Sequence, residues 1–220
     1  MSNQRQFVRQ TAAALMAFTS LLPGLAGYCA HAADTVLRQR PNVIVIMADD
    51  LGYECLGCNG GASYQTPRLD QLARTGVRFT HCFVNPLCTP TRAALMTGRY
   101  NFRNYERFGS LPEREFTFGH MMQDAGYATC IVGKWQLEGE GGTTPDRAVF
   151  DDYYMYSGSG SHHADPDMPD NDWEHVQHKE GEYGPKLAVD YLCDFLDRHR
   201  KKPFFAYYPL PIIKEKRKDQ

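Results

Sequence analysis

The chain has 220 residues, of which 42% are hydrophobic and 23% are charged, and its formal net charge is −2 at pH 7. This length and composition are those of a globular chain with one substantial hydrophobic core. The near-neutral charge gives no sign of nucleic-acid binding.

The first 32 residues have the pattern of a secretory signal peptide. Arg5 and Arg9 precede an apolar run over residues 12–25, and Ala30-His31-Ala32 offers a small-x-small cleavage site. The run is short and contains a proline and a glycine, which favours a signal peptide over a membrane span. No other segment has the length of a transmembrane segment. We therefore expect residues 1–32 to be removed and the protein to be exported, to a periplasmic or extracellular location.

Four apolar segments are predicted to form strands. The first, Asn42 to Ala48, is a continuous run rich in β-branched residues, which favours a strand buried on both faces of a parallel sheet. The other predicted strands are Val77 to Val84, Tyr127 to Val132 and Phe204 to Tyr208.

Helices are predicted between these strands, where start and stop signals flank amphipathic segments. They are Arg68 to Thr75, Pro90 to Thr97, Thr117 to Asp124, and a segment from Gly184-Pro185 to the basic run Arg198 to Lys202. Residues 138–184, rich in Gly, Asp, His and Pro, are expected to form a long surface excursion near the mouth of the site. The alternation predicts an α/β fold with a mostly parallel central sheet flanked by helices. Functional loops then belong at the carboxyl ends of the strands.

Cys88 occupies the most informative segment, Pro86 to Gly98, with the sequence P-L-C-T-P-T-R-A-A-L-M-T-G. It is expected just before a helix, where backbone N–H groups and the helix dipole favour an anion. Arg92, on the first turn, can reach the same spot. The alternative is a buried cysteine that behaves as a small apolar residue.

This segment resembles the signature of the type I sulfatases, C-x-P-x-R followed by an apolar pair and T-G. In that family the cysteine is oxidised to formylglycine, and the aldehyde hydrate is the nucleophile. The resemblance implies that a formylglycine-generating enzyme converts Cys88 and that Arg92 helps to bind the sulfate group. It also implies an alkaline phosphatase-like fold.

Asp49 and Asp50 directly follow the first predicted strand. Adjacent carboxylates repel one another unless a cation lies between them, and hard oxygen ligands suit Ca²⁺ or Mg²⁺. A turn with an N-cap aspartate is the alternative. The run P-N-V-I-V-I-M-A-D-D-L-G resembles the N-terminal strand of the sulfatases and its metal-binding aspartate pair. By that match, Asp49, Asp50 and the residue made from Cys88 are metal ligands.

Lys134 ends another predicted strand, within the run Gly126 to Gln136, which resembles the second sulfatase signature. A cation there can neutralise a bound sulfate ester, although a lone lysine at this place could equally be solvated. The family usually has a histidine where this chain has Gln136. Glutamine can donate and accept hydrogen bonds but cannot titrate, so Gln136 can orient the hydrate without acting as a base.

The resemblance implies a sulfuric ester hydrolase that acts on an aryl or carbohydrate sulfate with a divalent metal. Phosphonate or phosphate monoester hydrolysis on the same fold is a further alternative. Residues 36–211 are expected to be the N-terminal part of a sulfatase catalytic domain, and residues 212–220 an unrelated basic tail. The resemblance stops before further metal ligands and a second lysine. The alternative function is therefore a catalytically silent, truncated remnant with at most anion or partner binding.

Other cysteines and histidines carry weaker signals. Cys55-Leu56-Gly57-Cys58 has redox-motif spacing but lacks the surroundings of a thioredoxin site. No second Cys or His pair follows at zinc-finger spacing. His162 and His163 lie among four aspartates, a cluster that suits a solvated loop, a pocket lining or a metal site.

Overall fold

The computed structural model describes residues 40–156 and 183–211. The chain divides into two compact units, residues 1–41 and 42–220, and only residues 40–41 of the first are described. Three predictions therefore lie outside the described residues: the signal peptide, the basic tail after Pro211, and the loop that holds His162 and His163.

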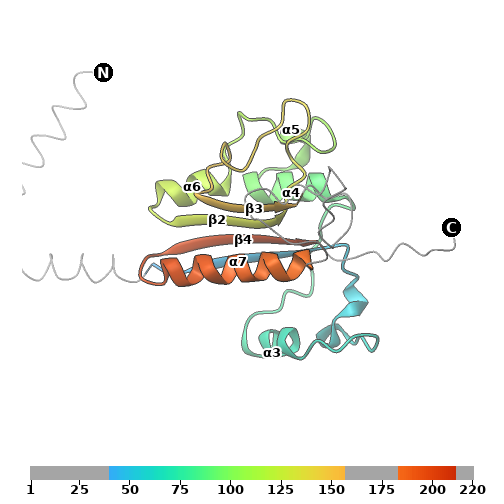
Figure 1. Cartoon of the computed structure of the whole chain (residues 1–220). Helices are drawn as coiled ribbons and strands as arrows, with labels where there is room; N and C mark the ends of the chain where they lie inside the picture. The colour runs from blue at the N-terminus through green and yellow to red at the C-terminus, as the bar shows by residue number, and fades with distance from the viewer. Residues whose placement is uncertain (1–39, 157–182, 212–220) are drawn as a thin grey trace, which may run out of the picture. The chain divides into compact units, whose positions relative to one another are not determined.

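Four parallel strands form one sheet in the order β1-β4-β2-β3 (Figure 1). The strands are β1 Val43–Asp49, β2 Ala128–Lys134, β3 Asp152–Tyr156 and β4 Phe204–Pro211. The strands predicted near residues 127–132 and 204–208 are confirmed as β2 and β4. The fold class is also confirmed, because helices flank both faces of an all-parallel sheet.

Four helices agree closely with the sequence pattern, and a fifth, short helix over residues 101–104 was not predicted. They are α3 Pro67–Thr75, α4 Cys88–Thr97, α5 Asn101–Asn104, α6 Phe118–Asp124 and α7 Gly184–His199, and the short 3-10 turns η2 Tyr53–Cys55 and η3 Gly57–Asn59 precede α3. A reciprocal capping box between Thr117 and His120 starts α6, and Gly98 in the left-handed conformation ends α4. None of the helices in the described residues is both long and apolar enough to cross a bilayer.

The core lies on both faces of the central strands. Helix α7 covers one face, as Figure 1 shows, and packs Ala188, Leu192 and Phe195 against side chains of β2 and β4. On the opposite face, α4 contributes Ala93 and Met96 to a cluster with aromatic side chains from the loops and β4. These two layers hold the carboxyl ends of the strands in fixed positions.

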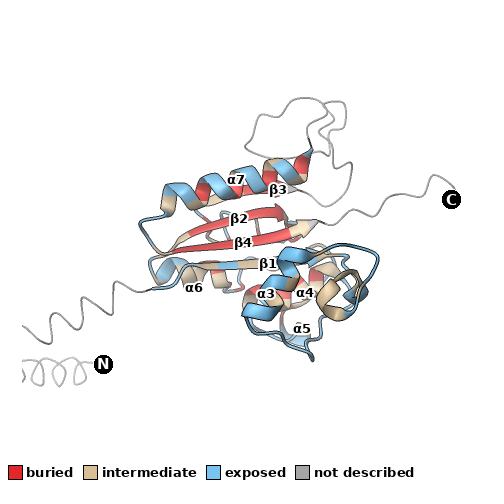
Figure 2. Cartoon of the chain, turned by 90° about the horizontal axis from the view of Figure 1, so that it is seen from below, coloured by how far each residue is buried: buried red, intermediate tan, exposed pale blue. Residues whose placement is uncertain are grey.

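The prediction that residues 42–48 are buried on both faces was wrong. Strand β1 is at the edge of the sheet, and its residues alternate between half-buried and exposed, with Ile46 64% exposed (Figure 2). Val43, Val45 and Met47 pack on the α4 side, whereas Ile44 and Ile46, on the other side, are 45% and 64% exposed. An apolar run shows that a strand can be buried, but not which elements cover it.

Two further predictions need correction. Residues 77–84 form no strand, and Val77 and Phe83 are 83% and 89% exposed, because no described strand pairs with this segment. The expected surface excursion over residues 138–184 instead contributes β3 and the buried residues Phe150 and Tyr154 to the core. Periodicity missed β3 because this strand has only five residues and no apolar–polar alternation.

Candidate active site

Helix α4 begins at Cys88, two residues earlier than predicted. Leu87 before it is extended, and Pro90 lies in the first turn, where its missing N–H costs no hydrogen bond. Cys88 is partly exposed. Its place at the N-terminus of a ten-residue helix puts it next to free backbone N–H groups and the positive end of the dipole.

A network of side chains fixes the backbone around Cys88. The Thr91 hydroxyl donates to the carbonyl oxygens of Leu87 at 2.9 Å and Asn85 at 3.0 Å. The Asn85 amide donates to Asn101 Oδ1 at 2.7 Å, and Asn101 Nδ2 donates to the Pro90 carbonyl oxygen at 2.8 Å. Asn85, Thr91 and Asn101 were not predicted as site residues. Thr91 lies within the motif and Asn85 and Asn101 lie near it, so their polarity was the only indication of this role.

A cavity of about 310 Å³ lies between the end of β1 and the start of α4, lined by residues 47–51, 84–88 and Thr91. It brings together three predicted site residues, Asp49, Asp50 and Cys88. Asp50 has a φ of 57°, a left-handed conformation that few residues other than glycine adopt. The turn directly after β1 therefore carries backbone strain, a feature that is common at functional sites.

Lys134 and Arg92 both meet the carboxylate of Asp49. Lys134 Nζ donates to Asp49 Oδ2 at 2.6 Å, and Arg92 Nη2 is 3.3 Å from the same oxygen. Strand β4 lies between β1 and β2, so Asp49 and Lys134 meet across the carboxyl edge of the sheet. The structure thus joins four of the predicted residues to Cys88 at one edge.

Arg92 carries a charge that the protein only partly pairs. It is 1% exposed, and its Nη1 donates to the Lys134 carbonyl oxygen at 3.1 Å. Its Nε finds no hydrogen-bond acceptor among the described residues. Burial raises the pKa of neighbouring Tyr207 to about 12, and the charge of Arg92 opposes that shift. A buried guanidinium with an unfilled donor favours an anion nearby.

Arg92, Lys134 and Gln136 do not line the cavity, and of these three only Gln136 makes no contact with Asp49 among the described residues. It has a φ of 56°, and its buried Oε1 accepts no hydrogen bond from the described residues. A strained backbone and an unsatisfied amide oxygen, two residues beyond Lys134, are costly for a purely structural residue.

The cavity's donor atoms fit a hard divalent cation. Asp49 and Asp50 supply carboxylate oxygens, the ligand type that Ca²⁺ and Mg²⁺ prefer. They supply fewer oxygens than the roughly six to eight that Ca²⁺ takes. Within residues 40–156 and 183–211, no group of three or more His, Cys, Asp or Glu residues could hold a metal ion.

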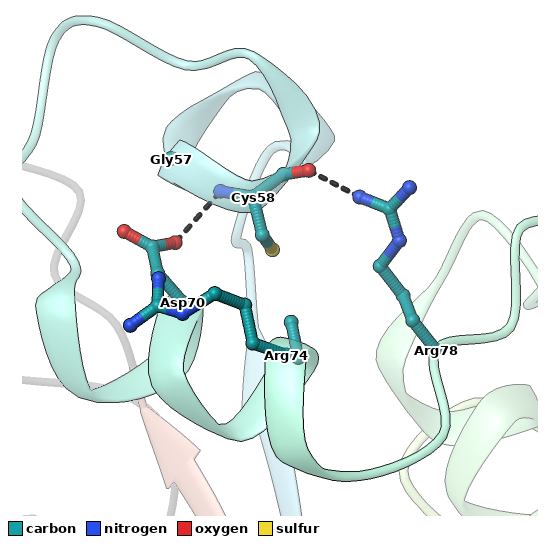
Figure 3. A pocket seen from close by; sticks show the side chains of 6 residues that line it. Gly57, Cys58, Asp70, Arg74 and Arg78 are labelled. Atoms are coloured by element: carbon teal, nitrogen blue, oxygen red, sulfur yellow. Dashed lines mark hydrogen bonds between the residues drawn. The ribbon is translucent and has the colours of Figure 1, made fainter.

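A larger cavity, of about 470 Å³, lies beside α3 (Figure 3). It is lined by Gly57, Cys58, Asp70, Ala73, Arg74 and Arg78. Its polar groups serve the local fold, because the Cys58 N–H donates to Asp70 Oδ1 at 2.7 Å and Arg78 donates to the Cys58 carbonyl oxygen. Cys55 and Cys58 are both unpaired. None of the predicted site residues lines this cavity.

The sulfatase family model matches residues 41–211, and the chain belongs to the sulfatase family. The chain is 33% identical to mouse N-acetylgalactosamine-6-sulfatase over an alignment 205 residues long, which covers 78% of this chain and 39% of that protein. It is 35% identical to N-acetylglucosamine-6-O-sulfatase of Bacteroides thetaiotaomicron over an alignment 198 residues long, which covers 86% of this chain and 34% of that protein. Human arylsulfatase D is 48% identical over an alignment 110 residues long, which covers 44% of this chain and 18% of that protein.

Solved structures agree with this assignment and with an alkaline phosphatase-like fold. The crystal structure of Ps i-CgsB in complex with k-i-k-neocarrahexaose superimposes with a TM-score of 0.68 at 30% identity, covering 78% of this chain and 45% of that chain. BT4656 in complex with its substrate D-glucosamine-2-N,6-O-disulfate gives a TM-score of 0.64 at 27% identity, covering 81% and 35%. The chain therefore spans less than half the length of these relatives.

Proposed function

We propose that the protein is a sulfuric ester hydrolase of the arylsulfatase type, with a nucleophile made from Cys88 and a divalent cation bound by Asp49 and Asp50. One observation carries the proposal: the cavity joins these three residues, and Asp49 connects them to Arg92 and Lys134. The names of the relatives, which include an arylsulfatase and two hexosamine sulfatases, favour an aryl or carbohydrate sulfate ester as substrate.

The position of Cys88 suits a group that handles an anion. The first N–H groups of α4 and its dipole favour the negative charge of a sulfate group at this end of the helix. Formylglycine at position 88, made by a formylglycine-generating enzyme, would supply a hydrated aldehyde with one hydroxyl for attack and a second whose deprotonation releases sulfate. The hydrogen bonds of Thr91 and Asn101 hold the backbone of this turn in place.

Asp49 and Asp50 would hold the cation, Ca²⁺ or Mg²⁺, against the same cavity. When bound, the cation would lower the pKa of a coordinated hydroxyl and polarise the sulfate oxygens. Arg92 is fixed by burial and can place a guanidinium donor on a sulfate oxygen. Lys134 adds a second positive charge.

Gln136 would take the place of a proton-transferring histidine. Its amide can donate one hydrogen bond and accept another, so it can orient a hydroxyl without changing charge. Its buried Oε1, which accepts no hydrogen bond from the residues that the structure describes, is the acceptor available for that contact.

The assay compares the chain expressed with and without a formylglycine-generating enzyme. Peptide mass analysis measures loss of the Cys88 sulfur, and release of 4-nitrophenol from its sulfate ester measures turnover in the presence of Ca²⁺. We expect turnover only in converted protein and none in Cys88→Ala. Glucosamine 6-sulfate and 4-nitrophenyl phosphate, tested in parallel, define the ester class. Converted protein that cleaves neither sulfate would instead support the catalytically silent alternative.

We also propose that residues 1–32 direct export and are then removed, as their charge and apolar pattern indicate. Mass analysis of protein from an exporting host is expected to show a chain that begins at Ala33. A mature chain that retains Met1 would contradict this proposal.

A further inference from the structure

The Oδ2 atom of Asp49 already binds two positive charges of the protein itself. Lys134 Nζ is 2.6 Å away and Arg92 Nη2 is 3.3 Å away. The Asp49 side chain is 12% exposed and that of Lys134 11%, so water screens this ion pair only partly. Any cation that binds to Asp49 must therefore compete with a charge that is already present.

The two cationic partners differ in how firmly they are held. Arg92 is 1% exposed, and its Nη1 is anchored independently on a backbone carbonyl oxygen. The amine of Lys134, in contrast, has Asp49 Oδ2 as its hydrogen-bond partner in the structure and stands on a flexible four-carbon chain. Lys134 is thus the partner that can leave without breaking the packing around it.

A divalent cation held by Asp49 would draw on the same carboxylate and repel the ammonium group beside it. We infer that Lys134 occupies the cation's place on Asp49, and that cation binding releases the amine toward the sulfate group. This inference rests on the proposed function, since it assumes that Asp49 binds the cation. By linkage, sulfate and the cation then bind cooperatively.

The first test measures Ca²⁺ binding by calorimetry to the unmodified chain and to Lys134→Met. Loss of the competing amine is expected to tighten Ca²⁺ binding about tenfold, equal to about 1.4 kcal/mol. Lys186→Met is the matched control, because Lys186 pairs with Asp190 on the exposed surface of α7. Its Ca²⁺ affinity should match that of the parent.

The outcomes separate this inference from the proposed function. Ca²⁺ binding to the parent with no gain in Lys134→Met overturns the inference and leaves the cation site standing. Absence of Ca²⁺ binding in both proteins overturns the cation site and the inference together. Ca²⁺ binding that is lost in Asp50→Asn supports the cation site.

The second test needs no variant at Lys134. Amine acetylation followed by peptide mass analysis measures how fast Lys134 and Lys186 react with and without saturating Ca²⁺. We expect Ca²⁺ to raise the rate at Lys134 several-fold and to leave Lys186 unchanged. Asp49→Asn should raise the Lys134 rate without Ca²⁺. Equal Lys134 rates with and without bound Ca²⁺ would overturn the inference.

Discussion

Replacing Asn104 with alanine is expected to lower the free energy of unfolding by about 2–3 kcal/mol. Asn104 is 1% exposed, and its Nδ2 donates to the Ala93 carbonyl oxygen at 3.1 Å and to Thr97 Oγ1 at 2.6 Å. Each bond contributes about 1 kcal/mol net, and the lost packing adds roughly 0.5–1 kcal/mol. A contact to the Arg99 carbonyl oxygen at 3.5 Å is too long to add much.

Urea unfolding followed by circular dichroism, with linear extrapolation, measures this difference. Asn59→Ala is the matched control, because its Nδ2 also donates to a backbone carbonyl oxygen, at 3.1 Å, but in an exposed position. The control should lose no more than about 0.5 kcal/mol. An Asn104→Ala loss as small as that of the control would refute the view that this network holds α4 in place.

Three further predictions concern the strands and the site. Gly133 has a φ of 119°, and a Cβ added there would lie only 2.4 Å from the Pro209 carbonyl oxygen in β4, which is a clash. Gly133→Ala should therefore lower the free energy of unfolding, measured in urea, by more than about 2 kcal/mol. Gly141→Ala, at a φ of 71° in open space, should cost about 1 kcal/mol, and equal losses would contradict the steric argument. Burial raises the pKa of Tyr207 to about 12 from an ordinary value near 10, so its contribution to stability is complete below pH 10 and is lost as the pH rises toward 12. Between pH 9 and 12 the free energy of unfolding should therefore fall less steeply in Tyr207→Phe than in the parent, whereas Tyr64→Phe, at an exposed position, should follow the parent. Gln136→His introduces a group that titrates near pH 6.5, so the pH dependence of kcat for an aryl sulfate should show an additional change between about pH 5 and 8. An unchanged pH dependence would show that position 136 does not contact the reacting groups.

Much of the sheet could be predicted from the sequence, because buried parallel strands are apolar throughout and helix ends carry caps. The limits of α3 and α6 follow directly from Thr66-Pro67 and Thr117. Residues 77–84 show where such reasoning fails. Their apolar–polar alternation is typical of a strand, but a strand also needs a partner strand for its backbone hydrogen bonds, and none of the described strands pairs with this segment.

The sequence could predict that the candidate residues lie at strand and helix ends, but not how their side chains pair. Because both residues end parallel strands, Asp49 and Lys134 are expected at the carboxyl edge of the sheet, but the sequence does not show that their side chains form an ion pair across β4. At the other side of the sheet, the edge strand β3 was not predicted from the sequence. There Asp152 accepts hydrogen bonds from Tyr191 and Arg198, an arrangement between β3 and α7 that depends on a strand the pattern did not reveal. Burial raises the pKa of the Cys130 thiol beside it.

The most direct test of the account uses Cys88→Ser. A serine hydroxyl at this position can take the sulfonate group from an ester, but it lacks the second hydroxyl that would let the group leave. After incubation with 4-nitrophenyl sulfate and Ca²⁺, mass analysis is predicted to find one sulfonate group on the peptide that contains position 88, with one equivalent of 4-nitrophenol released. Cys88→Ala should carry none. An unmodified position 88 in Cys88→Ser, under conditions in which the converted parent turns over, would contradict the assignment of this residue as the nucleophile.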